Sequence, residues 1–297
     1  AFWRARYRLD HWLSMAAYLL EQGLSQDNIF DLAHQGWNRF DANVKQHDID
    51  LALLAERSYV VQGPWDIASY YRDTLHRDFP QPVILVPGNK HYSWPKSANV
   101  FGISEKAIWP TELDRFGRVS VSALRKNIER ARREQRPIMM NVSVAGTTEL
   151  GTVDPVDEVS DLLDEYRKEQ GLHIWHHVDA AYGGYFCSTF RSGESLLAEK
   201  AVSAFSALSR VDSVTLDPHK LGFVPYACGA FLVREPHSYS VSQISAPYLR
   251  QDEKAEHPSW STTLEGSRSA TGAGAGWLSA KELPLDASGH GAILNQT

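Results

Sequence analysis

Lys220 and Asp179 are the two residues whose types and positions most directly suggest chemistry. Lys220 ends the sequence DPHK, which follows the apolar run SVTL, and Asp179 ends the run LHIWHHVD before AAYGG. A lysine at the end of a buried strand is costly unless it is paired, deprotonated or used covalently. Alone, Lys220 fits a surface lysine after a proline-containing turn. However, Asp179 lies 41 residues earlier, which leaves room for a strand, a helix and a return strand that bring both side chains to one crevice.

A lysine and a strand-end carboxylate are the minimum set of groups that pyridoxal 5'-phosphate (PLP) requires. The amine attaches the aldehyde of the cofactor covalently, and the carboxylate keeps its pyridine nitrogen protonated, so that the ring accepts electrons. The glycines after Asp179 let a flat ligand approach the backbone closely. His91, in NKHYS after the run VILVPG, is placed to stack on one face of such a ring, opposite Ala181.

The elements that must position these residues alternate between helices and short apolar strands. Apolar residues recur at helical spacing within residues 118–136 and 156–170, and Gly171 caps the second helix. Runs typical of buried strands are VILVPG, IMMNVSVAG, LHIWHHVDAAYGG, SVTLDPHK and ACGAFLVRE. This alternation predicts α/β units around a largely parallel sheet, in which ligands gather beyond the carboxyl ends of the strands.

The remaining segments have weaker patterns. Residues 13–24 and 48–57 show helical spacing, and residues 64–82 are rich in turn-forming and aromatic residues. Residues 266–277 (GSRSATGAGAGW) are small rather than polar, which favours a tightly packed helix over a linker.

Five segments, in order along the chain, resemble the group II PLP-dependent amino-acid decarboxylases. They are KHYSWPKSANVFGI (90–103), VSVAGTTELGTVDPVDEV (142–159), HVDAAYGGYF (177–186), DSVTLDPHKLGFVPYACGAFLVRE (212–235) and TLEGSRSATGAGAGW (263–277). KHYSWPKSA, PYACGA and LEGSR are most similar to bacterial tyrosine decarboxylases, while the aromatic-amino-acid and glutamate branches stay open. The resemblance implies the aspartate-aminotransferase-like fold (fold type I), whose PLP-binding large domain has a mainly parallel seven-stranded sheet flanked by helices. It also implies a homodimer with the active site at the subunit interface.

The resemblance assigns roles to residues that match the motifs of the family. Lys220 would hold PLP covalently, and Asp179 would pair with its pyridine nitrogen. His91 and Ala181 would cover the two faces of the ring. Further implied cofactor contacts are His219 to the phosphate, Thr148 and Ser143 on the hydroxyl side, and Ser267 with Arg268 toward the phosphate site of a neighbouring subunit.

Two further residues resemble parts of the family's substrate machinery. Tyr248, 28 residues beyond Lys220, matches the place of a loop tyrosine that protonates the substrate carbon, although an ordinary loop aromatic fits it equally. His11, in YRLDHW, resembles a substrate-pocket histidine of the tyrosine branch.

The implied reaction is α-decarboxylation of an L-amino acid, with tyrosine or another aromatic amino acid favoured, to the amine and CO₂. The open alternatives are a glutamate or aspartate decarboxylase, another PLP-dependent carbon–carbon lyase, and a catalytically silent homologue that acts as a scaffold. The last is supported by residues 12–30, where the Gly- and Ser-rich phosphate loop of the family is absent. A metal site of His173, His176, His177 and Asp179 is disfavoured, because on a strand His176 would point away from the other two histidines.

Composition limits what else the protein could be. The chain has 297 residues, a net charge of −6 with 30 basic and 36 acidic side chains, and two cysteines. Two cysteines cannot form a disulfide scaffold and fit a reducing compartment, so we expect a cytoplasmic protein. Because the chain has no basic excess and no apolar run near the roughly 18 residues of a membrane span, we expect it to bind neither nucleic acid nor membrane. Residues 1–60 are expected to form an N-terminal helical segment and residues 61–297 the PLP-binding large domain. Because the family is typically much longer and carries a C-terminal small domain, we expect a part of a longer polypeptide.

Overall fold

The computed structural model describes residues 1–190, 196–225, 227–235, 241–242, 264–265 and 269–296. The strands are β1 (Val83–Pro87), β2 (Ile108–Thr111), β3 (Ile138–Val144), β4 (His176–Asp179), β5 (Ser213–Leu216) and β6 (Ala230–Val233). The α-helices are α1 (Phe2–Glu21), α2 (Ile29–Leu32), α3 (Gly36–Gln46), α4 (Leu51–Ala55), α5 (Tyr59–Asp73), α6 (Ser93–Val100), α7 (Val121–Arg133), α8 (Val156–Gln170), α9 (Glu199–Ser206), α11 (Thr271–Glu282) and α12 (His290–Leu294). Short 3₁₀ helices are η1 (Glu105–Ala107), η2 (Gly183–Thr189) and η3 (Ala207–Ser209).

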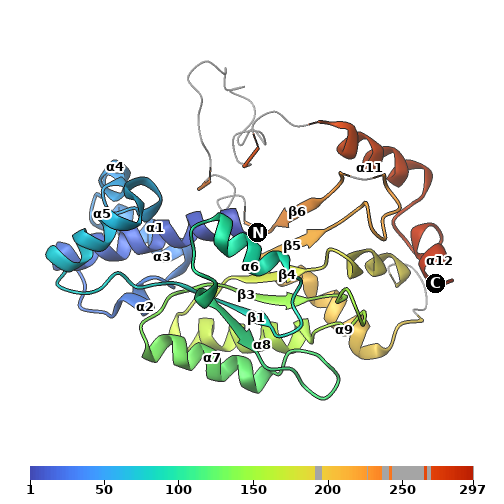
Figure 1. The fold of residues 1–297 in the computed structure, drawn as a ribbon, viewed down its shortest axis with the longest axis horizontal. Helices are drawn as coiled ribbons and strands as arrows, with labels where there is room; N and C mark the ends of the chain where they lie inside the picture. Colours follow the sequence, from blue (N-terminus) through green and yellow to red (C-terminus); the bar gives the residue numbers. More distant parts are fainter. Residues whose placement is uncertain (191–195, 226, 236–240, 243–263, 266–268, 297) are drawn as a thin grey trace.

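The strands form one sheet in the order β2-β1-β3-β4-β5-β6 (Figure 1). The first five strands in this order run parallel to one another, and β6 runs antiparallel to β5. The largely parallel sheet predicted from the alternating elements is therefore confirmed. A seventh strand is not found among the described residues. Because the parallel strands share a direction, the loops after β1, β3, β4 and β5 leave the same edge of the sheet.

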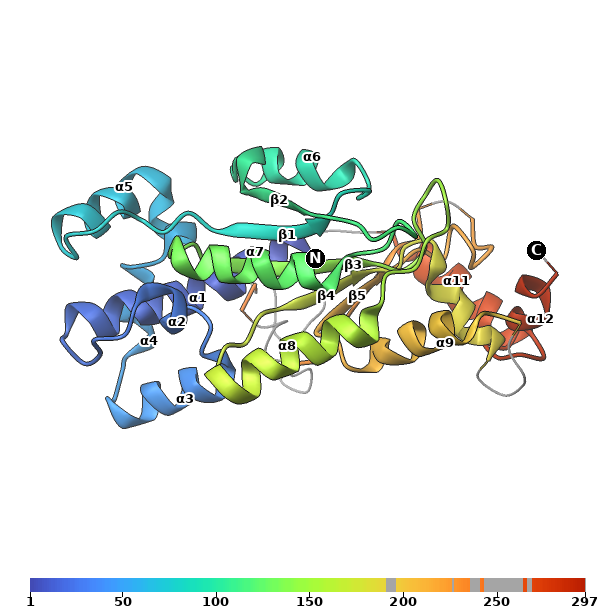
Figure 2. The ribbon, with the colours of Figure 1, turned by 90° about the horizontal axis from the view of Figure 1, so that it is seen from below.

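Helices cover both faces of the sheet (Figure 2). On β1, Ile84 and Val86 belong to a hydrophobic cluster with α1, whereas Val83 and Leu85 belong to a second cluster with α7 and α8. This is the alternation of a strand buried on both faces, and each such aliphatic side chain contributes about 1.5–3 kcal/mol by its burial. The N-terminal helix α1 thus packs directly on the sheet that residues 61–297 form.

One segment differs from the sequence expectation, and a second agrees with it in part. The turn-rich stretch 64–82 is helical as far as Asp73, because Gly63 takes a φ of 82° and kinks α5 just before Pro64. Pro64 then lies in the first turn after the kink, where its missing N–H costs little. The small-residue stretch 266–277 contains most of α11 and is helical there rather than a linker; no residue of α11 is buried, but a Cβ at Gly272 would lie only 2.6 Å from the carbonyl oxygen of Ala227, so the helix packs closely at that point.

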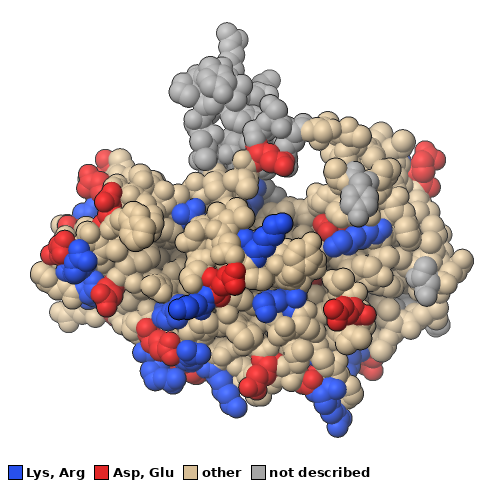
Figure 3. All heavy atoms as spheres, viewed as in Figure 1, with Lys and Arg blue, Asp and Glu red and all other residues tan. Residues whose placement is uncertain are grey.

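Charged side chains of both signs are interspersed over the face viewed in Figure 3. Some of them join neighbouring helices: Arg125 on α7 forms a bidentate pair with Glu165 on α8 at 2.7 Å. Such exposed pairs contribute at most about 1 kcal/mol each, so the packed clusters dominate stability. Among the described residues, no helix is both long and apolar enough to cross a membrane.

A buried carboxylate, Asp154, joins the end of β3 to the loop before α7. Its two oxygens accept hydrogen bonds from the backbone N–H groups of Val119 and Val144, both at 2.7 Å. The side chain is 1% exposed, and burial raises the pKa of Asp154 from 3.8 to about 6.

We expect the stability of the protein relative to an Asp154→Asn variant to decrease as the pH rises. The raised pKa means that the folded protein binds this proton more tightly than the unfolded chain does. The resulting stabilisation is present below pH 3.8 and is lost as the pH rises through about 6. Two pKa units correspond to about 3 kcal/mol in the free energy of unfolding. Urea unfolding of both proteins between about pH 4 and pH 7 measures the difference, and parallel stability curves would contradict this role of Asp154.

Candidate active site

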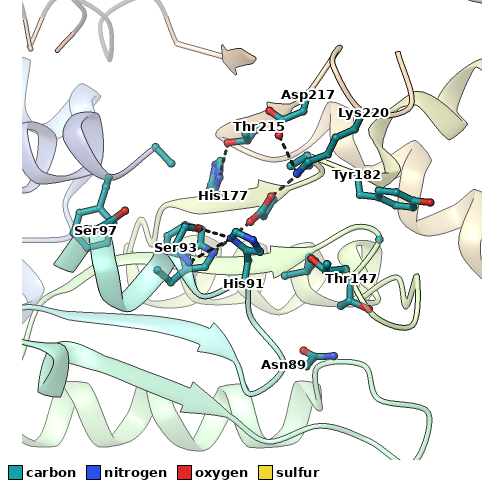
Figure 4. A pocket seen from close by; sticks show the side chains of 18 of the residues that line it. Asn89, His91, Ser93, Ser97, Thr147, His177, Tyr182, Thr215, Asp217 and Lys220 are labelled. Carbon is teal, nitrogen blue, oxygen red and sulfur yellow. Dashed lines mark hydrogen bonds and ion pairs between the residues drawn. The ribbon is translucent and has the colours of Figure 1, made fainter. Parts of the chain in front are cut away.

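The carboxyl ends of β1, β3, β4 and β5 border a pocket of about 480 Å³ (Figure 4). Each of the four strands supplies polar lining residues from its end or from the loop that follows it. They include Asn89, His91 and Ser93 after β1, Thr147 and Thr148 after β3, His177 and Asp179 on β4, and Thr215, Asp217 and Lys220 on or after β5.

Asp179 and Lys220 both line this pocket. Asp179 ends β4 and lies beside Thr215 of β5 in the strand register. Lys220 follows β5 in a turn that is closed by a hydrogen bond from its backbone N–H to the carbonyl of Asp217, at 2.9 Å. The Lys220 Nζ also lies 3.0 Å from a carboxylate oxygen of Asp217, so this amine is held by an ion pair.

His91 and Ala181 are also among the lining residues. The His91 Nδ1 lies 3.3 Å from the backbone nitrogen of Ser93 and 2.9 Å from its Oγ. A backbone N–H can only donate, so Nδ1 acts as the acceptor, which orients the imidazole at the start of α6.

The glycines after Asp179 have a different use from the one expected. Gly183 donates a hydrogen bond to the carbonyl of Ala145 at 3.0 Å, and a Cβ at Gly183 would lie 2.3 Å from that oxygen. Gly146 has a φ of +95° at the same contact. These glycines let the loops after β3 and β4 touch each other, rather than making room for a ligand.

Ser143 does not line the pocket, in contrast to the expectation. It is fully buried, and its Oγ lies 2.9 Å from the Nε2 of His176, whose Nδ1 faces Ser160 of α8. Strand alternation gives the reason, because Val144 lines the pocket and the preceding residue must face the opposite helix layer. Thr148 does line the pocket, at its exposed rim.

His219 and His11 lie outside the lining. The His219 Nδ1 is 2.5 Å from the carbonyl oxygen of Cys228. His11 lies on α1, with its Nδ1 2.9 Å from the carbonyl of Tyr7 and its ring edge-on to Trp37. Neither imidazole is part of the pocket lining, although the His219 Nε2 lies 3.7 Å from a carboxylate oxygen of Asp217, which does line the pocket.

Three of the expected site residues, Tyr248, Ser267 and Arg268, lie outside the described residues. The alternative metal site fails on geometry: His176 faces α8, whereas His177 and Asp179 line the pocket. His173 pairs instead with Asp212 at 3.3 Å. In the described ranges, no cluster of three metal-ligating side chains is found.

Sequence reasoning did not place several polar side chains in the pocket, among them Trp94, His177, Thr215 and Asp217. Two of them stand close to the residues that were named: His177 is two residues before Asp179, and Asp217 is three residues before Lys220. Alternation along β4 would have placed His177 on the same face as Asp179, and DPHK would have drawn attention to Asp217. Trp94 carried no such signal.

Comparison with known proteins adds independent findings. The profile described as "Pyridoxal-dependent decarboxylase conserved domain" matches residues 52–273. An L-tyrosine decarboxylase of Enterococcus faecium is 35% identical over 233 residues, which cover 71% of this chain and 38% of that protein. A probable L-tyrosine/L-aspartate decarboxylase of Methanothermobacter thermautotrophicus is 34% identical over 204 residues, covering 68% of this chain and 49% of that protein.

The fold is similar to that of solved structures. A crystal structure of mouse CSAD superposes with a TM-score of 0.59 at 25% identity, covering 77% of this chain and 45% of that chain. The expected fold type I architecture is thereby confirmed. The chain spans 38% of the length of the Enterococcus faecium protein and 49% of the Methanothermobacter protein.

Proposed function

Because this chain belongs to the pyridoxal-dependent decarboxylase family, we propose that the protein catalyses PLP-dependent α-decarboxylation of an L-amino acid, with tyrosine as the favoured substrate. The observation that carries the proposal is the placement of the Lys220 amine and the Asp179 carboxylate in one pocket, at the ends of two adjacent parallel strands. An amine and a carboxylate so placed match the aldehyde and the ring nitrogen of PLP.

The residues present fit the cofactor. The pocket of about 480 Å³ is within the usual range for small-molecule sites. Asp179, Lys220 and His91 all line it, which provides a carboxylate, an amine and an imidazole for the ring nitrogen, the aldehyde and a ring face of the cofactor. For the phosphate and hydroxyl groups, the lining supplies Thr147 and Thr148, and we keep Thr148 as a proposed contact.

The side chains of the pocket then have separate tasks. When bound, the cofactor supplies a ring that accepts the electron pair released as CO₂ leaves. Lys220 holds the cofactor covalently between turnovers, and Asp217 fixes the position of its amine through the ion pair at 3.0 Å. Asp179 holds a proton on the ring nitrogen. We keep the hydroxyl of Tyr248 as the proposed donor of the proton that the substrate carbon receives.

The preference for an aromatic substrate is supported by the pocket and by a relative. Aromatic side chains contribute much of its lining: Phe2, Trp3, Trp94, Phe101 and Tyr182. Such side chains favour an aromatic ring over a second carboxylate, through apolar contact and edge-to-face packing. The Enterococcus faecium relative is an L-tyrosine decarboxylase. Aspartate is the second candidate substrate, because the Methanothermobacter relative is described as a probable L-tyrosine/L-aspartate decarboxylase.

A homodimer is part of the same proposal. It is supported by α11, which has no buried residue and exposes two large apolar side chains: Trp277 is 65% and Leu278 is 55% exposed. A helix with exposed large apolar residues is typical of an interface between subunits.

The test of the proposed function is CO₂ release from a panel of L-amino acids by the full-length protein with PLP. We expect kcat/KM for tyrosine to exceed that for aspartate and glutamate by at least about tenfold, with tyramine as the product. Release from aspartate or glutamate alone would favour the second candidate. An absence of CO₂ together with an absence of PLP binding would leave the silent scaffold as the better reading.

A further inference from the structure

The indole of Trp94, in the first turn of α6, lies against the carboxylate of Asp179. Its Nε1–H donates a hydrogen bond to one oxygen of that carboxylate at 3.2 Å, although the two residues are 85 positions apart. We propose that Trp94 is a positioning residue, which holds the Asp179 carboxylate in the orientation that meets the ring nitrogen of PLP. This inference rests on the proposed function, since it concerns the same cofactor.

The carboxylate of Asp179 is held at both of its oxygens. The backbone N–H of Ala181 donates to Oδ1 at 3.3 Å, and the Trp94 indole donates to Oδ2. One bond alone would leave the carboxylate free to turn about its terminal torsion, which has only a broad preference. Two donors on different oxygens fix the plane of the group. Lys220 does not take part, because its amine pairs with Asp217 at 3.0 Å.

The indole is itself held by packing, so it can transmit orientation. Trp94 is 6% exposed, and its ring lies 6.2 Å from that of Phe2 and 5.9 Å from that of His177. His177 is fixed in turn by the hydroxyls of Ser213 at 2.9 Å and Thr215 at 3.1 Å. Atoms with so many fixed neighbours have little freedom to move.

The protonation state of His177 also determines the charge next to Asp179. The two side chains share one face of β4, two residues apart. Burial holds the pKa of His177 well below 6.5, so this imidazole is neutral near pH 7. A neutral neighbour does not compete with a protonated ring nitrogen for the negative charge of Asp179.

Trp94→Phe is the variant that separates positioning from packing. Phenylalanine keeps an aromatic ring against Phe2 and His177 but removes the N–H donor. The matched control is Trp109→Phe, because Trp109 on β2 is also 6% exposed yet does not line the pocket. Its ring packs under the guanidinium of Arg130 instead, at 4.0 Å.

The readout is the ¹⁵N NMR shift of PLP labelled at the ring nitrogen, bound to the full-length protein at neutral pH. We expect Trp94→Phe to move this shift toward the unprotonated position and to lower kcat about tenfold, with KM nearly unchanged. Trp109→Phe should match the unchanged protein in both measurements. If Trp94→Phe does not fold, Trp94→Met offers a flexible apolar side chain of similar reach and the same comparison.

A second comparison asks whether Trp94 acts through Asp179. In an Asp179→Ala background, adding Trp94→Phe should change the ¹⁵N shift no further, because the acceptor is already gone. A further change of similar size there, or an unchanged shift in the single variant with PLP bound, would overturn the inference and leave the proposed function standing. Failure of the unchanged protein to bind PLP would overturn both.

Discussion

Replacing Lys220 with alanine is expected to abolish covalent attachment of PLP and to lower decarboxylase turnover by on the order of 10³-fold or more. Lys220 is the only lysine among the described residues that line the pocket. The measurement is the visible absorbance of lysine-bound PLP after dialysis, together with the rate of CO₂ release. Borohydride reduction followed by peptide mass mapping would locate the attachment in the unchanged protein.

The variant should remain folded, because the Lys220 side chain is 37% exposed and its loss leaves Asp217 only partly buried. Lys126→Ala, at an exposed position on α7, is the matched control and should keep both absorbance and turnover. An absorbance band that survives in Lys220→Ala after dialysis would show that another amine holds the cofactor.

The architecture follows from patterns that act over short distances. The apolar spacing in residues 156–170 predicts a helix that the structure forms over the same residues as α8, ended by Gly171 with a φ of 68°. The apolar runs before Asp179 and before DPHK form β4 and β5, which are adjacent and parallel. Because parallel strands end at one edge, the spacing alone predicts that Asp179 and Lys220 share a crevice.

Two kinds of feature could not be predicted from the sequence: contacts between distant segments, and which face of a strand each residue points to. The run IMMNVSVAG is apolar on both faces, so its pattern does not show which of Ser143 and Val144 faces the pocket. From the sequence alone, the missing side chain of Gly183 could equally make room for a ligand or for the backbone of Ala145, which lies far from it in the sequence. The Trp94–Asp179 hydrogen bond requires the relative placement of α6 and β4, which no local pattern encodes.

Asp179→Asn is expected to retain PLP but to lower turnover by about 10²–10⁴-fold. Asparagine has nearly the same shape, and its amide oxygen can still accept one of the two hydrogen bonds that Asp179 receives, from Trp94 or from Ala181, so the fold around the pocket should be kept. It has no negative charge, however, and so cannot stabilise a proton on the ring nitrogen of the cofactor. The measurements are PLP affinity by fluorescence titration and kcat for CO₂ release.

The control for Asp179→Asn is Asp114→Asn. Asp114 also accepts backbone N–H bonds, from Phe116 at 2.8 Å and Arg118 at 3.0 Å, but it does not line the pocket. That variant should keep normal turnover. Equal losses in the two variants would point to a general loss of stability rather than to chemistry at the pocket.

A cofactor analogue tests directly whether Asp179 acts through the ring nitrogen. In 1-deaza-PLP a carbon replaces the ring nitrogen, so the carboxylate has no atom on which to hold a proton. If Asp179 acts only through that nitrogen, the unchanged protein with the analogue should be as slow as Asp179→Asn with PLP, and adding the substitution to the analogue should cost little more. Near-normal turnover of Asp179→Asn with PLP would instead remove this carboxylate from the chemistry and leave it a structural acceptor for Trp94 and Ala181.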